Sequence, residues 1–277
     1  MRATSGLRIS FLVIAVQFFT MLASNALLPA VGWPPERLDL LGQVILFSTA
    51  ALVLFGHPGL RRYCVGELRI PIPDRSWPAL LGATIANVSI PFAIVGAMAV
   101  QAFASDTLAQ LPSRMPTMDP VAAWNATLSP PGLFRLVLLS WLVGPLIEEL
   151  VFRGLVFRAF ERDWGWLASM AATSVLFGLM HPSRFVATGL GSVILVCVLR
   201  RTGSLRACIL VHAAFNAVVS WPILGQVLFS APDGDGTSLS TWTLPVASLA
   251  FACVSLPACV WMARRARDAG GRSRPRA

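Results

Sequence analysis

Two adjacent glutamates, Glu148 and Glu149, interrupt an otherwise apolar stretch, LVGPLIEELVFRGLVF, at residues 142–157. On a helix, Glu149 and Arg153 are four residues apart and share a face, so we expect them to form an ion pair. Glu148 lies about 100° round the helix from Glu149 and has no charged residue at that spacing. The two carboxylates should therefore differ: one stays ionised beside the arginine, and the other is free to act as a general base. In a plainer interpretation, the Glu–Arg pair only locks helices together.

Histidine and asparagine side chains recur farther along the chain. His181 ends the segment FGLMH, four residues after Phe177, so the aromatic ring should pack beside the imidazole. His212 and Asn216 in HAAFN are also four residues apart and share a helix face. The third histidine, His57, precedes a proline at a loop edge and is interpreted as incidental. One histidine alone more often makes an ordinary interior hydrogen bond, but three segments that each bring polar groups inward favour one shared site in a helical bundle.

The surroundings of these polar residues are strongly apolar. The chain of 277 residues is 56% hydrophobic and only 13% charged, with a mean hydropathy of +0.69, whereas soluble domains carry about 25% charged residues. Apolar runs of about 20 residues recur along the whole length, which predicts transmembrane helices. We predict an all-α polytopic membrane protein, a bundle of about eight transmembrane helices at residues 9–31, 38–57, 78–103, 132–158, 165–182, 184–200, 206–229 and 241–263.

The burial of charge in such a bundle indicates function. A charged side chain at the centre of a bilayer costs about 2.5–3.5 kcal/mol on insertion scales, so these residues usually face a partner or a cavity. Of the thirteen acidic residues, only Glu148 and Glu149 lie deep inside a predicted span. The two glutamates are therefore the first candidates for a functional site.

The basic residues indicate topology rather than nucleic-acid binding. The formal net charge is +9, and all 22 basic residues are arginine. They cluster at residues 57–77, 158–162 and 200–206 and in the C-terminal tail, which eight spans with cytoplasmic N- and C-termini place on the cytoplasmic side. We therefore expect an integral membrane protein whose partners include the lipid bilayer and not nucleic acid.

The predicted depths of the polar residues disagree with one another. At a rise of about 1.5 Å per residue, Glu148 should lie about 15 Å and His212 about 9 Å below the inner surface, but His181 about 24 Å. These side chains meet only if some helices are tilted or displaced. We therefore expect the two short spans, 165–182 and 184–200, to form a tilted or partly crossing hairpin with a buried turn.

Three short motifs resemble those of a known family. EELVFR at residues 148–153 is an EExxxR, FGLMH at 177–181 is an FxxxH, and HAAFN at 212–216 is an HxxxN. In this order on successive membrane helices, they resemble the motifs of the CAAX-protease and bacteriocin-processing family (CPBP, or Abi), which comprises intramembrane glutamate proteases and their relatives. The motifs cover about 69 residues, and the helix layout extends the likeness to most of the chain.

The resemblance implies a role for each motif residue. Glu148 would be the base that activates water, and His181 would help to hold or polarise that water. His212 and Asn216 would form the oxyanion hole for the tetrahedral intermediate. Three further residues would support the site and orient the substrate: Glu149, Arg153 and Phe177.

The resemblance also implies a bacterial intramembrane endopeptidase that hydrolyses peptide bonds of membrane-associated substrates and needs no cofactor. Its partners would be a peptide or membrane-protein substrate and the bilayer of the bacterial cytoplasmic (inner) membrane. We expect residues 1–263 to form a single transmembrane helical domain with a catalytic core at about 132–229. The basic tail, 264–277, would be cytoplasmic and disordered.

Other functions stay open at this point. A non-catalytic family member could keep the motifs for stability and act as a bacteriocin-immunity factor or as the partner of another membrane protein. Proton-coupled transporters also bury carboxylates and histidines. Two histidines and a glutamate would suit zinc as well, although the chain contains no HExxH motif. It also lacks the GxSxG of a serine hydrolase.

Overall fold

The computed structural model describes residues 35–104, 134–181 and 184–220, together with isolated positions between 12 and 23 and at 132 and 257. This part of the chain is helical and contains no strand, which confirms the all-α prediction there. Apart from those isolated positions, the first and last predicted spans and the basic tail lie outside the described residues: 9–31, 241–263 and 264–277.

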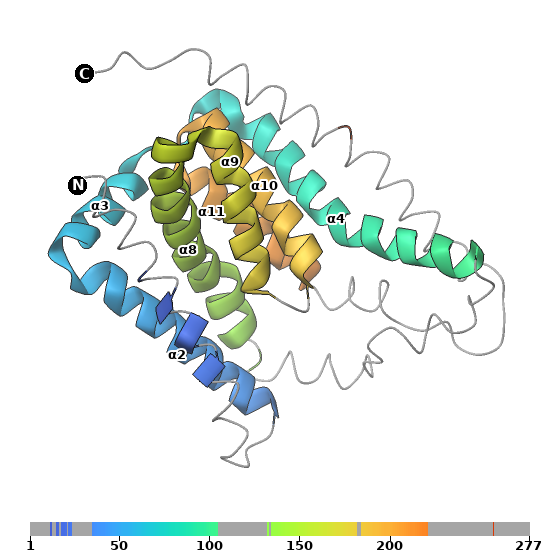
Figure 1. The fold of residues 1–277 in the computed structure, drawn as a ribbon, viewed down its shortest axis with the longest axis horizontal. Helices are drawn as coiled ribbons and strands as arrows, with labels where there is room; N and C mark the ends of the chain where they lie inside the picture. Colours follow the sequence, from blue (N-terminus) through green and yellow to red (C-terminus); the bar gives the residue numbers. More distant parts are fainter. Residues whose placement is uncertain are drawn as a thin grey trace.

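The described helices follow one another along the chain in two groups (Figure 1). The first group consists of α2 (Pro35–Gly56), α3 (Pro58–Arg69), the short 3-10 helix η2 (Asp74–Ser76) and α4 (Trp77–Ala104). The second begins with a continuous helical run made of η4 (Phe134–Val143), α8 (Gly144–Glu149), η5 (Leu150–Phe157) and α9 (Arg158–Leu179). It ends with α10 (Phe185–Thr202) and α11 (Leu205–Val219). Both η4 and η5 are π-helical, and they flank the two glutamates.

Few of the described helices are individually long and apolar enough to span a membrane. Among the described helices, α10 alone is long and apolar enough to cross a membrane by itself. Leu40–Gly56 of α2 and the following α3 pass the same test only as a pair, and they meet at a bend of 99°. The apolar helix α11 is shorter. The predicted count of eight spans is therefore not confirmed and stays a prediction.

The segment after α2 is a helix and not the loop that the sequence suggested. Pro58 occupies the first turn of α3, where a missing N–H costs nothing. The Nδ1 atom of His57 caps this turn by accepting a hydrogen bond from the Leu60 amide at 3.4 Å. Leu60 and Cys64, one turn apart, are buried against the core. His57 therefore caps α3, and its interpretation as incidental to the function stays a prediction.

Two buried apolar clusters hold the helices together. The first joins α2 and α3 to α8 and η5, and it includes Leu54, Leu60 and Val151. The second joins α4 and α10 to α11, and it includes Ala86 and Leu195. The run from α8 to η5 is therefore packed against other helices and is held rigidly where the glutamates lie.

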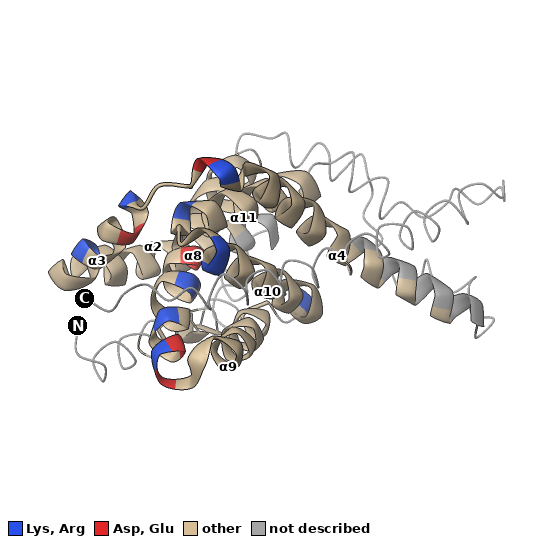
Figure 2. Ribbon diagram, turned by 90° about the horizontal axis from the view of Figure 1, so that it is seen from above, with Lys and Arg blue, Asp and Glu red and all other residues tan. Residues whose placement is uncertain are grey.

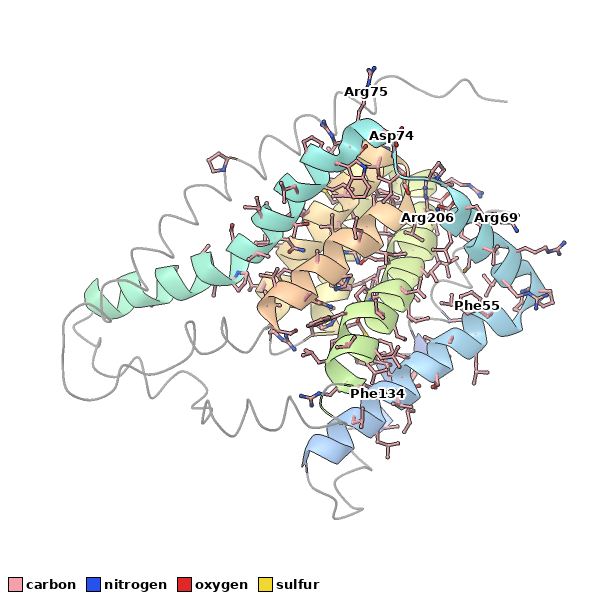
Figure 3. All side chains as sticks on the ribbon, turned by 180° about the vertical axis from the view of Figure 1, so that it is seen from behind. Phe55, Arg69, Asp74, Arg75, Phe134 and Arg206 are labelled. Carbon is pink, nitrogen blue, oxygen red and sulfur yellow. The ribbon has the colours of Figure 1, made fainter. Side chains whose placement is uncertain are left out.

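The arginine-rich connections gather at one end of these helices. Figure 3 shows Arg69, Asp74, Arg75 and Arg206 at this end and Phe134 at the other. Seen from above, the charged residues surround α3, α8 and the beginning of α9 (Figure 2). The sequence placed three of these connections on one side of a membrane, and the structure confirms that they share one end.

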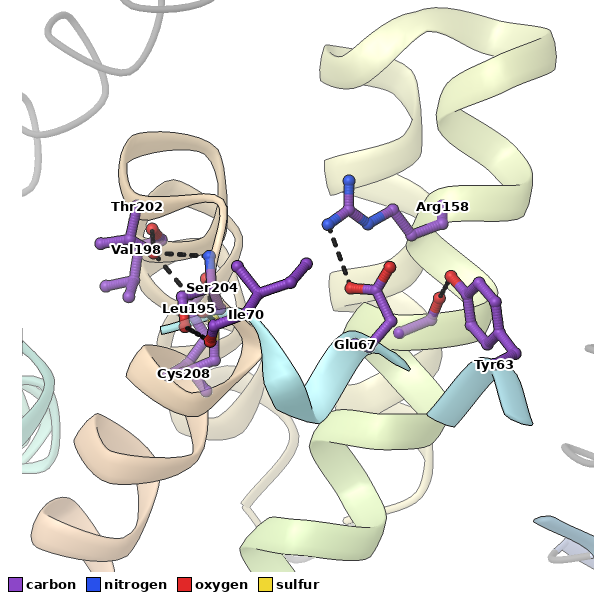
Figure 4. A network of polar contacts seen from close by, with 10 residues as sticks. Tyr63, Glu67, Ile70, Arg158, Leu195, Val198, Thr202, Ser204 and Cys208 are labelled. Atoms are coloured by element: carbon purple, nitrogen blue, oxygen red, sulfur yellow. Dashed lines mark hydrogen bonds and ion pairs between the residues drawn. The ribbon is translucent and has the colours of Figure 1, made fainter. Parts of the chain in front are cut away.

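Polar contacts tie the three connections to one another. The Glu67 carboxylate of α3 pairs with Arg158 at 3.3 Å, and Tyr63 donates a hydrogen bond to the Gly154 carbonyl at 2.7 Å (Figure 4). The hydroxyl of Ser204 donates to the Ile70 carbonyl at 2.9 Å. Arg200 also pairs with Glu161. These contacts fix α3 and the start of α11 against the helix that carries the two glutamates.

A sharp turn at Gly165 reverses the chain between the helix of the two glutamates and the helix that ends near His181. Gly165 has φ 73° and ψ 168°, a conformation that side-chain-bearing residues rarely adopt, and it breaks α9 into two parts. The first arm therefore extends to Trp164 rather than ending near Arg158 as predicted. Arg153 lies twelve residues before Gly165 and Phe177 twelve residues after it, and their side chains are stacked. The reversal of the chain at Gly165 thus brings these two side chains into contact. The predicted tilt of the hairpin 165–182 and 184–200 stays a prediction, because its turn at 182–183 lies outside the described residues.

The close approach of α9 and α10 gives a prediction for stability. A Cβ atom added at Gly178 would lie 2.9 Å from both the Phe185 carbonyl oxygen and the ring atom Cδ2 of Phe185. We expect Gly178→Ala to destabilise the protein by about 1–3 kcal/mol, because a backbone atom cannot give way to the added methyl group. The measurement is the free energy of unfolding in detergent micelles.

Gly66→Ala provides the matched control for this prediction. Gly66 lies on the exposed face of α3, and an added Cβ would meet nothing within 4 Å. Alanine in an exposed helix interior favours the folded state by up to about 1 kcal/mol over glycine. Equal stability of the two variants would contradict the close packing at Gly178.

Candidate active site

The core of the site is a completely buried ion pair. Arg153 donates a hydrogen bond from Nη1 to Oε1 of Glu149 at 2.9 Å, and both side chains are 0% exposed. The pair that the sequence predicted from the four-residue spacing is therefore confirmed. The pair extends from the end of α8 into the π-helical η5, and π-helical turns occur frequently at functional sites.

The aromatic ring of Phe177 covers the arginine. The guanidinium carbon of Arg153 lies 4.6 Å from the ring centroid, in cation–π geometry. The Phe152 ring meets the same ring edge-to-face, with centroids 4.9 Å apart. Among the residues that the structure describes, Nε and Nη2 of Arg153 and Oε2 of Glu149 have no hydrogen-bond partner. The charges of this pair are thus shielded on one side by aromatic surface.

His212 lies between the two glutamates. Its Nδ1 atom is 2.8 Å from Oε1 of Glu149, and its Nε2 atom is 3.8 Å from Oε2 of Glu148. Glu148 differs from its neighbour, because its side chain is 19% exposed and no described arginine pairs with it. The adjacent carboxylates therefore have different surroundings within the described part of the chain, as the helix geometry predicted. Of the two, Glu148 is the partly exposed one.

His181 lies on the other side of Phe177. The ring centroids of Phe177 and His181 are 4.9 Å apart, so the predicted packing of these two rings is confirmed. The Nδ1 atom of His181 lies 2.9 Å from the Phe177 carbonyl, which can only accept, so Nδ1 carries the proton and donates. In the neutral ring, Nε2 then has a free lone pair. The His212 ring is 6.0 Å from Phe177, which places the two histidines around one phenylalanine.

Asn216 follows His212 by one turn of α11. Its amide nitrogen donates a hydrogen bond to the Ser140 carbonyl of η4 at 2.8 Å. This bond uses one of the two N–H groups of the amide and holds the side chain against the helix of the glutamates. The hydrogen bond orients the amide, although nothing in the sequence pointed to Ser140, because its contribution is a backbone carbonyl.

The structure brings the predicted site residues together from three helices. Contacts link six of the seven side chains in an unbroken series, and the seventh, Asn216, is one helical turn from His212. The sequence did not reveal which glutamate His212 contacts more closely, since that choice depends on how α11 packs against α8. No group of three or more His, Cys, Asp or Glu in the described part of the chain has the arrangement of a metal site.

The fold and the site together define a helical protein that gathers its ionisable groups in a buried interior cluster. Residues 130–218 match the family model described as type II CAAX prenyl endopeptidase Rce1-like. The match spans about a third of the chain and contains every residue of the site described above. The match confirms, for this segment, the resemblance seen in the sequence. The family is one of integral membrane proteases. Searches of curated proteins and of solved structures found no match.

Proposed function

We propose that the chain is an intramembrane endopeptidase that hydrolyses peptide bonds of membrane-associated substrates with a water molecule activated by Glu148. One observation carries this proposal. Two adjacent carboxylates differ in their surroundings. Glu149 is buried in an ion pair with Arg153, whereas Glu148 is partly exposed and, among the described residues, pairs only with His212 within 4 Å. A partly exposed carboxylate that no arginine holds, beside a buried cluster of donors, suits a general base.

Glu148 and His181 would act on the attacking water. Glu148 accepts a proton from the water as its oxygen attacks the carbonyl carbon of the scissile bond. The free lone pair on Nε2 of His181 would accept a hydrogen bond from the same water and so orient it. The tetrahedral intermediate then collapses, the C–N bond breaks, and the proton on Glu148 passes to the leaving amine.

Asn216 and His212 would stabilise the negative charge on the carbonyl oxygen. The Ser140 carbonyl fixes one N–H group of Asn216, which leaves the second to donate to the oxyanion. Donors held in place before the reaction need no reorganisation as charge develops, and they act more strongly where water is excluded. Glu149, Arg153 and Phe177 would keep these groups in position without touching the reacting atoms.

The setting that we propose is a bacterial cytoplasmic membrane, with both termini in the cytoplasm. The gathering of three arginine-rich connections at one end of the helices supports this orientation. Residues 1–263 would form one transmembrane domain with a catalytic core at about 132–229. The substrate would be a peptide or a membrane-protein segment that enters from the cytoplasm or laterally between helices.

The oxyanion role of Asn216 leads to a kinetic prediction. Asn216→Asp replaces an amide donor by a carboxylate that only accepts hydrogen bonds. The carboxylate would lose the bond to the Ser140 carbonyl and would repel both this carbonyl oxygen and the oxyanion. We expect kcat to fall by about 10²–10³-fold, the usual effect of losing one oxyanion donor, with little change in KM. Steady-state kinetics on a cleaved peptide measure both constants. An unchanged kcat in a folded variant would show that Asn216 makes no contact with the transition state.

The proposed function is tested by proteolysis with the purified full-length chain. The protein, in detergent micelles and in liposomes, is incubated with a library of membrane-associated peptides, with and without a chelator, and the products are identified by mass spectrometry. We expect cleavage that the chelator does not affect and that Glu148→Gln abolishes. Loss of activity with chelator would favour a metal enzyme. A folded wild-type protein that cleaves nothing across the library would favour a non-catalytic partner protein.

A further inference from the structure

Both ring nitrogens of His212 face carboxylate oxygens. Nδ1 lies 2.8 Å from Glu149, and Nε2 lies 3.8 Å from Glu148. Ionised carboxylate oxygens only accept hydrogen bonds, and a neutral imidazole has one N–H and one lone pair. A neutral His212 would therefore direct its lone pair at one of the two glutamates. Only the imidazolium, which has an N–H at both positions, matches both neighbours.

The other groups around His212 point to the same protonation state. From η5, Arg153 contributes one positive charge, which Glu149 balances. From the end of α9, His181 donates its Nδ1 proton to a backbone carbonyl, a bond that needs no charge on the ring. On α11 itself, the thiol of Cys208 donates to backbone carbonyls. Among the described groups, the charge of Glu148 then has no balancing cation unless His212 carries it, and a carboxylate that is only 19% exposed favours such a partner.

The protonation of His212 decides whether this residue can stabilise an oxyanion. Glu149 holds the proton on Nδ1, so in the neutral ring Nε2 would be bare and could not donate. In the imidazolium, Nε2 carries a proton. The nitrogen lies 3.8 Å from Oε2 of Glu148, too far for a direct hydrogen bond, so this proton is available to a substrate oxygen.

We propose that Glu149 is a positioning residue that keeps His212 doubly protonated, so that Nε2–H serves as a charged donor to the oxyanion. This inference rests on the proposed peptide hydrolysis. It gives the second glutamate of the motif a task beyond its ion pair with Arg153. It also explains why Glu148 and Glu149 are adjacent: one carboxylate acts on water while the other charges the histidine between them.

The test is a direct observation of the protons on His212 in the intact protein. The sequence contains three histidines, so ¹⁵N-histidine labelling gives a simple spectrum. His57→Asn and His212→Gln assign the signals, since His57 only caps α3. We expect protons on both ring nitrogens of His212 in the wild-type protein at a pH where it is active. A single proton, on either nitrogen, would overturn the proposal whether or not a substrate has been found.

Glu149→Gln tests the link between this proton and catalysis. The glutamine oxygen still accepts from Nδ1–H, but its charge is gone, so we expect His212 to keep one proton, on Nδ1. We expect kcat to fall by about 10²-fold with little change in KM. If His212 keeps both protons and kcat is unchanged in this variant, the positioning role of Glu149 is wrong. That result would not affect the proposal that Glu148 is the general base. The wild-type spectrum decides the protonation state even where this variant does not fold.

Glu67→Gln is the matched control. Glu67 is also a carboxylate in an ion pair on a helix that packs against η5, but its partner is Arg158 and it does not contact His212. We expect both ring protons of His212 to remain in this variant. Their loss would show that the spectrum reports a general disturbance of the fold, and the effect of Glu149→Gln would then not support the proposal.

Discussion

Glu148→Gln is expected to abolish measurable peptide hydrolysis, with kcat lowered by about 10²–10⁴-fold, the usual contribution of a general base. An amide of the same size cannot accept a proton from water. The fold should be unaffected, because the Glu148 side chain is 19% exposed and no arginine in the described part of the chain would lose its partner. The measurement is kcat on a cleaved peptide, together with the unfolding transition of each protein.

Glu161→Gln is the control for this experiment. Glu161 is an acidic residue in the first arm of α9, and it pairs with Arg200 at the arginine-rich end of the helices. This variant should retain the activity of the wild-type protein, because it changes a carboxylate outside the site. If Glu148→Gln cleaves as fast as Glu161→Gln, water is activated by some other group.

Arg153→Met is expected to have the largest effect on stability, a loss of about 3–5 kcal/mol in the free energy of unfolding. Methionine can still cover the Phe177 ring, so the loss comes from electrostatics. The carboxylate of Glu149 would stay 0% exposed without its arginine, and a buried charge deprived of its partner is strongly destabilising. Unfolding in mixed micelles measures the difference.

The ion pair between Arg158 and Glu67 provides the comparison. It joins two helices as well, but its side chains are 31% and 15% exposed, so solvent screens it. Arg158→Met should cost at most about 1 kcal/mol. The double variant Glu149→Gln with Arg153→Met should recover most of the stability lost in Arg153→Met, because it removes both buried charges. Equal losses for the two arginine variants would contradict the dominant role of burial.

The helical fold could be predicted from the sequence because apolar runs and helical spacing are local properties. Residues 35–56, 77–104 and 185–202 are helical close to where the hydropathy pattern placed them. Helix α3 was missed because its composition is mixed and rich in arginine, so it resembled a loop between spans. Its apolar side, with Leu60 and Cys64, becomes meaningful only when the partner helix is known.

The site was predictable to the extent that it depends on spacing within one helix. The Glu149–Arg153 pair and the packing of Phe177 on His181 both follow from a four-residue separation, and both are present. The contact of His212 with Glu149 could not be predicted, because it joins residues 63 positions apart and depends on the rotation of α11. The depth argument failed for a similar reason: it ended a helix at Arg158 that continues to the turn at Gly165.

The number of residues on each side of Gly165 determines whether Arg153 and Phe177 can meet. Arg153 and Phe177 are each twelve residues from the turn. Deleting one residue from the α-helical part of either arm would move one of them by about 1.5 Å and rotate it by about 100°. Length changes in this hairpin should therefore be tolerated only in compensating pairs of whole helical turns, one in each arm. Related proteins could vary freely in sequence there while conserving the number of residues between the two motifs.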